Sequence, residues 1–214
     1  MDPRALNELA RITSAYLTAR GTAHVRHSGR AFSQHLWNTY LLLRQWQLDD
    51  TVALAGLCHS VYGTEDFAVA LFAPHERALL RAQIGAPAER LVHLFCTVPH
   101  KQILAASHPD QIGAQSTTAI TEDEHQALRY LLLANLLEQY GGPALSQRAV
   151  LVLVRPYWDL ALPCLSDPVA EHAETLFRRA RMPVLCARAW LFAGRLRQCL
   201  AGARRVLQPR SHHS

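Results

Sequence analysis

The sequence predicts an all-α protein folded as a single domain, and three observations support this prediction. Apolar residues recur with the period of an amphipathic helix along most of the chain. No run of alternating apolar and polar residues lies between hairpin turn signals, as a sheet would require. The 214 residues, 50% of them hydrophobic, can bury a sizeable core, and no linker-like change in composition divides them. We therefore expect one domain over 1–214.

The expected helices follow from this periodicity and from the residues that begin and end helices. Thr121 and Glu124 have the spacing of a capping box, and Gly141-Gly142-Pro143 would end the helix that they begin. The first half of the chain should bear the functional motifs, over 22–140, and the second half should add C-terminal helices, over 141–214. We expect helices over 3–19, 31–47, 50–60, 74–84, 86–97, 121–140, 145–162, 168–180 and 183–206.

The charges are unevenly distributed along the chain. Residues 1–174 carry 13 Lys or Arg and all 17 acids, whereas residues 175–214 carry nine Arg and no acid. These arginines fit either a nucleic-acid or phosphate patch or a solvated helix face. We favour the solvated face, because no aromatic interleaving or nucleic-acid motif accompanies the charge. The helix over 183–206 would dock on the body or mediate self-association into a homo-oligomer.

Several features predict a cytoplasmic protein that does not enter a membrane. Charged residues interrupt 1–20, so this segment lacks the continuous apolar stretch of a signal peptide. The most apolar segment, 149–165, contains Arg155, Pro156, Asp159 and Pro163 and is too short and too polar to span a bilayer. The five cysteines include no C-x-x-C pair, which favours reduced thiols over disulfides or a zinc site.

Three expected helices each place one polar residue on an apolar face. His35 has the spacing of a core stripe with Thr39, Leu42 and Trp46, and His59 follows small residues that would let a neighbouring helix approach. Asn135 aligns with a leucine face on a third helix. A buried imidazole or amide costs about 1–3 kcal/mol unless it finds a partner. Either each group is satisfied separately, or the three meet at a metal or in a polar pocket.

Two segments carry a family resemblance. The segments A-H-V-R-H-S-G-R-A-F-S-Q-H and A-G-L-C-H-S resemble the opening of the HD hydrolase domain of RelA/SpoT-type guanosine-tetraphosphate hydrolases. The likeness extends in order to A-N-L-L-E and covers roughly residues 22–140. It implies an HD-like helical bundle in which His35, His59 and Asn135 take the metal-ligand positions, with Mn²⁺ or Fe²⁺ as the cofactor. His59 would also belong to the catalytic machinery.

Two departures from the family pattern affect the expected metal site. Ser60 stands where the family has the HD aspartate, and Asn135 stands where it has the later metal-binding aspartate. Both anionic ligands are thus replaced by neutral groups, which weakens binding of a hard divalent ion. Glu65, Asp66 or His27 could compensate. The segment H-S-V-Y-G-T-E is similar to H-S-x-Y-G-T-E, which is typical of an uncharacterised group of HD-like proteins and assigns no activity.

The resemblance and the loop positions also suggest residues that would act on a substrate. Arg26 matches the arginine that stacks on guanine in the family, and a guanidinium can stack and bind phosphate in one geometry. The loop that follows the His59 helix offers a carboxylate as general base and hydroxyls for substrate contact. We expect Glu65 and His27 to be catalytic and Arg26, Ser60, Tyr62 and Thr64 to bind substrate. Ser60 and His59 are successive helical residues, which does not indicate a nucleophile and its base.

Several functions remain open on this sequence. The first is metal-assisted hydrolysis of a small polar metabolite or nucleotide, with the guanosine tetraphosphate reaction itself expected to be weak or absent. An iron-dependent oxygenase would need a richer set of His and Asp ligands. A metal-free lyase or isomerase would use His35 or His59 as acid or base. The alternative to an enzyme is a degenerate pocket that binds a small molecule or stabilises the fold.

Overall fold

The computed structural model is all-α apart from one small hairpin, as the sequence predicts. It describes residues 2–27, 29–112, 119–189 and 192. A π-helical turn, Thr18–Thr22, extends the first helix. The α-helices are α1 (Pro3–Leu17), α2 (Phe32–Gln45), α3 (Asp50–Cys58), α4 (Arg77–Ile84), α5 (Ala86–Thr97), α6 (His100–Ala105), α7 (Glu122–Tyr140), α8 (Leu145–Trp158) and α9 (Asp167–Arg179).

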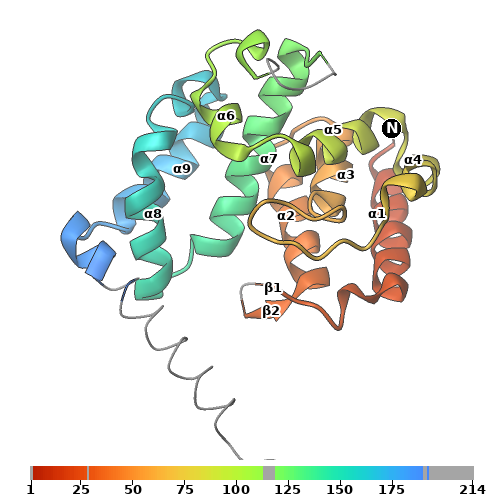
Figure 1. Ribbon diagram of the computed structural model, residues 1–214, viewed down its shortest axis with the longest axis horizontal. Coiled ribbons are helices and arrows are strands. Elements are labelled where there is room, and N and C mark those ends of the chain that lie inside the picture. Colours follow the sequence, from red (N-terminus) through yellow and green to blue (C-terminus); the bar gives the residue numbers. More distant parts are fainter. Residues whose placement is uncertain (1, 28, 113–118, 190–191, 193–214) are drawn as a thin grey trace, which may run out of the picture.

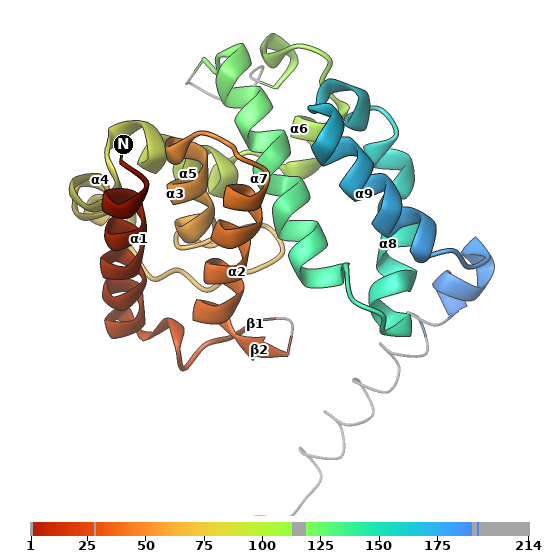
Figure 2. The same ribbon diagram turned by 180° about the vertical axis from the view of Figure 1, so that it is seen from behind.

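Helix α7 is the central element of the arrangement. Helices α1 to α5 lie on one side of it and α8 and α9 on the other, as two opposite views show (Figures 1 and 2). Helix α2 packs against both α3 and α7, and α5 packs against α3 and α7 as well. The faces of α2, α3 and α7 on which one polar residue each was expected are therefore brought together.

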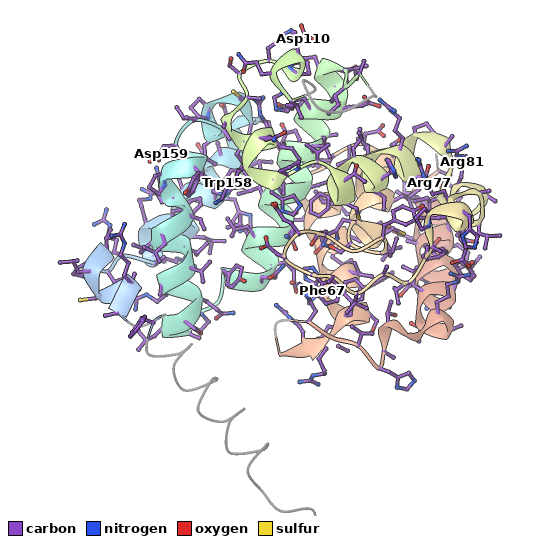
Figure 3. The ribbon with its side chains drawn as sticks, in the orientation of Figure 1. Phe67, Arg77, Arg81, Asp110, Trp158 and Asp159 are labelled. Carbon is purple, nitrogen blue, oxygen red and sulfur yellow. The ribbon has the colours of Figure 1, made fainter. Side chains whose placement is uncertain are left out.

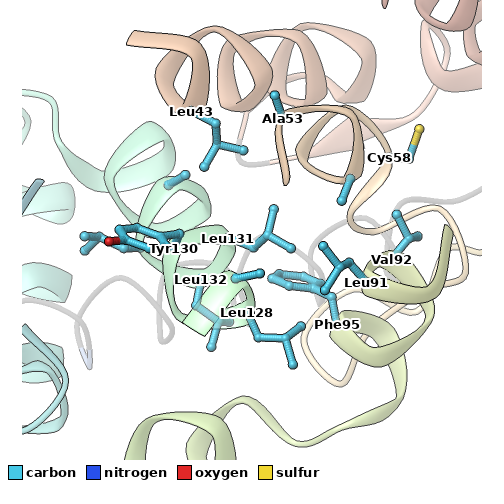
Figure 4. Packing of buried hydrophobic residues seen from close by; sticks show 14 of the residues in the cluster. Leu43, Ala53, Cys58, Leu91, Val92, Phe95, Leu128, Tyr130, Leu131 and Leu132 are labelled. Atoms are coloured by element: carbon cyan, nitrogen blue, oxygen red, sulfur yellow. The ribbon is translucent and has the colours of Figure 1, made fainter. Parts of the chain in front are cut away.

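The core between these helices is apolar and closely packed. Leu128 and Leu131 of α7 meet Leu43 of α2 and Phe95 of α5, and all four are at most 2% exposed (Figure 4). Gly56 on α3 lets α2 approach, since a Cβ built at this position would lie 2.1 Å from Leu43 Cδ1. Polar groups that enter such a core need partners there.

Local sequence explains where several helices begin and end. Thr121 and Glu124 form the expected capping box at the start of α7. The side chain of Asp49 caps α3. Gly85 separates α4 from α5 with a positive φ of 85°, which glycine adopts without strain. At α3 and α7, the capping side chain satisfies a free amide group of the first helical turn.

Several element boundaries differ from the sequence prediction. Helix α6 was not predicted, because six residues are too few to show a helical period. The expected loop at 21–30 contains strands β1 (Arg26–His27) and β2 (Arg30–Ala31), which pair antiparallel. A short 3-10 turn at Pro74–Glu76 replaces the start of the 74–84 helix, and α8 ends at Trp158, before the expected end at 162. Most of the helix expected over 183–206 lies outside the described residues.

Among the described helices, none is long and apolar enough to cross a membrane. Four cysteines of the described chain, Cys58, Cys96, Cys164 and Cys186, are free thiols.

Candidate functional site

Two buried histidines face each other at the junction of α2, α3 and α7. His35 comes from α2, and His59 follows the last residue of α3. Their Nε2 atoms are 3.1 Å apart, and both side chains are completely buried. Their rings meet edge to face, with centroids 4.9 Å apart. We call His35 and His59 the histidine pair.

The other nitrogen of each ring already has a partner that fixes its proton. His59 Nδ1 donates to the carbonyl oxygen of Gly56, at 2.7 Å. His35 Nδ1 donates to Glu138 Oε2, at 2.5 Å. In the tautomer that donates from Nδ1, an imidazole keeps a lone pair on Nε2. Two lone pairs at 3.1 Å repel each other unless a proton or a cation lies between them.

Glu138, on α7, is the anionic group of the site. Its side chain is 5% exposed, and its carboxylate also accepts from Asn38 Nδ2 at 3.0 Å and pairs with Arg30 at 2.8 Å. Burial alone would raise the pKa of Glu138, but the hydrogen bond of His35, together with Asn38 and Arg30, lowers it. Glu138 is therefore ionised at neutral pH and orients His35.

Asn135 lies one turn before Glu138 on α7 and is half-buried. Its side chain lies near His59, and its Oδ1 accepts from Gln139 Nε2 at 2.6 Å. Burial, followed by the nearby His35, lowers the pKa of His59 well below its usual value, although Gly56 and Asn135 oppose this shift. His59 is therefore neutral at physiological pH and keeps its lone pair.

His27, on β1, is a third imidazole beside the pair. Its ring centroid lies 4.6 Å from that of His35 and 4.5 Å from that of Phe67, which belongs to the loop after α3 (Figure 3). His27 Nε2 is buried and has no hydrogen-bond partner among the described residues. Burial, followed by His35 and Arg30, lowers the pKa of His27 to about 4. The site thus contains a neutral imidazole with an unused buried nitrogen.

Three of the residues expected to act on substrate have other structural partners in the protein. The hydroxyl of Tyr62 donates to buried Glu89, at 3.0 Å, so Tyr62 belongs to the ion-pair network of Glu89. The backbone of Thr64 forms an isolated bridge with Phe67. Arg26 is exposed, and its guanidinium donates to the carbonyl of Gly29 within the hairpin.

The other two expected residues differ in burial. Ser60 is 5% exposed and directly follows His59. Glu65 is exposed and accepts from the backbone amide of His100 at 3.0 Å. It belongs to a surface cluster with Asp66 and His100, in which one ligand atom of each residue lies within 4.8 Å of the others. Glu65 is therefore not among the groups that contact the histidine pair.

The donor atoms at the histidine pair fit a divalent cation. Two nitrogens bound to one ion at about 2.0–2.1 Å lie about 2.8–3.4 Å apart in octahedral or tetrahedral geometry, which agrees with the 3.1 Å separation. Metal-bound imidazoles usually donate their other N–H to a carboxylate or a backbone carbonyl, as His35 and His59 do. No third His, Cys, Asp or Glu of the described chain brings a ligand atom within 4.8 Å of both. The Asn135 amide and solvent would complete the set.

Glu138 is the residue of the site that the sequence analysis missed. A signal was present, because Glu138 lies three residues after Asn135 and therefore shares its helix face. It is also the only acid between Glu124 and Asp159. Its partners His35, Asn38 and Arg30 are 100 or more residues away in the chain, so no local pattern joins them.

Comparison with protein-family models gives a match over residues 16–100 to a family described as a domain of unknown function (DUF6817). The matched segment contains His27, His35 and His59, and it ends before α7, which carries Asn135 and Glu138. Searches of curated proteins and of solved structures gave no match. The family description assigns no activity.

Proposed function

We propose that the protein is a variant HD-type enzyme that uses a divalent cation at the histidine pair to hydrolyse a small polar metabolite or nucleotide. The observation that carries the proposal is the approach of His35 Nε2 and His59 Nε2 to 3.1 Å, with each Nδ1 already bonded. When bound, the cation would supply Lewis-acid activation of water or of a substrate oxygen. The resemblance of residues 22–140 to HD hydrolases supports this reaction class.

The protein's own groups would organise such a reaction. Glu138 holds His35 in the tautomer that offers Nε2, and the Gly56 carbonyl does the same for His59. The Asn135 side chain, at His59, would orient a bound oxygen. His27 would use its free Nε2 to hydrogen-bond a polar group of the substrate. Phe32 and Phe67, which pack on His27, would limit the access of water.

A metal-free acid–base enzyme, a lyase or an isomerase, is the second candidate. The 3.1 Å separation also suits an N–H···N hydrogen bond, and the Glu138 carboxylate would balance the charge of a protonated pair. In this case Glu138, His35 and His59 would form one proton-transfer chain. Arg30, paired with Glu138, would limit how far the carboxylate can take up the proton.

Metal content separates the two candidates. We expect protein purified without chelators to contain a divalent metal near one ion per chain, and His35→Gln or His59→Gln to lose it. His93→Gln, on the half-buried face of α5, is a matched histidine control that should keep it. A folded wild-type protein that stays metal-free in metal-supplemented buffer would exclude the first candidate. Catalytic turnover by this metal-free wild-type protein would favour the acid–base enzyme.

Hydrolysis is tested separately with a panel of phosphate esters and nucleotides. We expect turnover to require added metal and to disappear in His35→Gln, with little or no release of pyrophosphate from guanosine tetraphosphate.

We also propose that the protein acts in the cytoplasm on a small molecule rather than on nucleic acid. Self-association through residues 183–206 is a further proposal, which the molar mass in solution of chains with and without this segment would test.

A further inference from the structure

The ligand atoms at the histidine pair are nitrogen-rich and uncharged. His35 and His59 offer imidazole nitrogens, and Asn135 adds a neutral amide. Ser60, the residue after His59 in the sequence, carries a neutral hydroxyl rather than a carboxylate. Imidazole favours borderline cations such as Zn²⁺, Fe²⁺ and Co²⁺, whereas carboxylates and water favour Mg²⁺ and Mn²⁺. The ligand atoms at the histidine pair therefore favour borderline divalent cations over Mg²⁺ and Mn²⁺.

Glu138 does not change this balance, because its oxygens are already occupied. Oε2 accepts from His35 Nδ1, and Oε1 accepts from Asn38 and pairs with Arg30. A carboxylate in this position strengthens the basicity of the imidazole that it holds. Glu138 therefore increases the donor strength of nitrogen without adding an oxygen ligand to the pair.

A second group of residues on the same protein has the opposite donor chemistry. Glu65, Asp66 and His100 bring two carboxylates and one imidazole within 4.8 Å of one another, at a partly exposed position. This surface cluster would favour Mn²⁺ relative to the histidine pair. Any measurement of metal preference must therefore separate the two groups.

We propose that the histidine pair selects a borderline divalent cation, of the Zn²⁺, Fe²⁺ or Co²⁺ kind, over Mn²⁺ and Mg²⁺. The proposal rests on the proposed function, since it assumes that the pair binds a cation. It goes further by assigning the chemical class of that cation from the ligands of this chain.

The test uses the full chain and two sets of variants. Glu65→Gln with Asp66→Asn removes the surface carboxylates and leaves the pair intact, whereas His35→Gln and His59→Gln each remove one nitrogen of the pair. Zn²⁺ affinity is measured by calorimetry, Co²⁺ binding by its visible absorption, and Mn²⁺ binding by loss of the free-ion electron paramagnetic resonance signal. Circular dichroism and urea unfolding confirm that each variant is folded.

In the Glu65→Gln/Asp66→Asn protein we expect Zn²⁺ to bind at least about a hundredfold more tightly than Mn²⁺. Co²⁺ should give ligand-field bands that Zn²⁺ abolishes, and both histidine variants should lose them. Mn²⁺ affinity within tenfold of Zn²⁺ affinity, lost on His35→Gln, would overturn the selectivity and leave the metal centre standing. No binding of any of the three ions to the surface-cluster variant would overturn the metal centre itself and the selectivity with it.

Discussion

His35 Nδ1 donates a hydrogen bond to Glu138 Oε2, at 2.5 Å, although 103 residues separate them in the sequence. Helix α2 is held against the C-terminal end of α7 at this point, and the Nε2 of His35 is thereby directed at His59. The bond determines which nitrogen of His35 is available for chemistry. It is the most direct target for perturbing the site without removing either histidine.

Replacing Glu138 with Gln should weaken metal binding while leaving both histidines in place. The amide keeps the shape of the carboxylate but loses the charge that orients and strengthens His35. We expect Zn²⁺ affinity to fall about 10–100-fold, as is usual when the partner of a metal-bound histidine is lost. Calorimetry measures this change, and Glu8→Gln, on the exposed face of α1, is the matched control. Equal affinities for Glu138→Gln and wild type would show that Glu138 does not support the pair.

The sequence was informative wherever local periodicity decides structure. The inward faces of α2 and α3 were predicted, and His35 and His59 are completely buried. The periodicity of residues 86–97 predicted the bounds of α5. Contacts across the fold were not predictable in the same way. Glu138 was missed because its partners come from distant helices, and Glu65 was expected at the site because it lies near His59 in the chain.

The partial burial of Asn135 and the presence of the β1–β2 hairpin were not predictable from sequence periodicity. Asn135 shares a helix face with buried leucines but is half-buried, and its Oδ1 accepts a hydrogen bond from Gln139 Nε2. The β1–β2 hairpin has only two residues in each strand, so alternation cannot reveal it. His27 reaches the site because the hairpin pairs it with Arg30, whose side chain binds Glu138 on α7.

Gly56→Ala should destabilise the protein because the new methyl group has no space. Its Cβ would lie 2.1 Å from Leu43 Cδ1 in a filled core. We expect a loss of about 1–3 kcal/mol in the free energy of unfolding, typical of overpacking. Urea unfolding of Gly56→Ala, Leu43→Ala and the double variant measures the coupling. The double variant should be more stable than the sum of the single effects predicts, and simple additivity would contradict the steric explanation.

His27→Phe should leave the unliganded protein at least as stable as the wild type. The new ring keeps the aromatic contacts with Phe32 and Phe67 and removes a buried nitrogen that has no partner. An unsatisfied buried polar group costs about 1–3 kcal/mol, so we expect no loss and up to about 1 kcal/mol of gain. Urea unfolding tests this, with His24→Phe at an exposed position of the same segment as the control. A clear loss of stability confined to His27→Phe would mean that the imidazole makes a contact that stabilises the fold.

Glu89 should make the stability of the protein depend on pH in the acid range. It is completely buried on α5, where Arg77, Arg81 and the Tyr62 hydroxyl bond to its carboxylate at 2.6–3.3 Å. Both arginines belong to α4, and Figure 3 shows them away from Phe67. Burial alone would raise the pKa of Glu89, but the hydrogen bonds of Arg77, Tyr62 and Arg81 outweigh it and lower the pKa.

A carboxyl group whose pKa is lower in the folded state stabilises the fold when ionised. The contribution of Glu89 is therefore fully present above the unfolded pKa of about 4.3 and is lost as pH falls through the folded pKa. Glu89→Gln should cost about 1–3 kcal/mol at pH 7, because the amide replaces the charged hydrogen bonds from Arg77 and Arg81 with weaker ones. It should also flatten the fall in stability below pH 4.3, because its side chain does not titrate. Urea unfolding of both proteins from pH 3 to pH 7 measures the two slopes, and parallel slopes would show that other carboxylates cause the acid dependence.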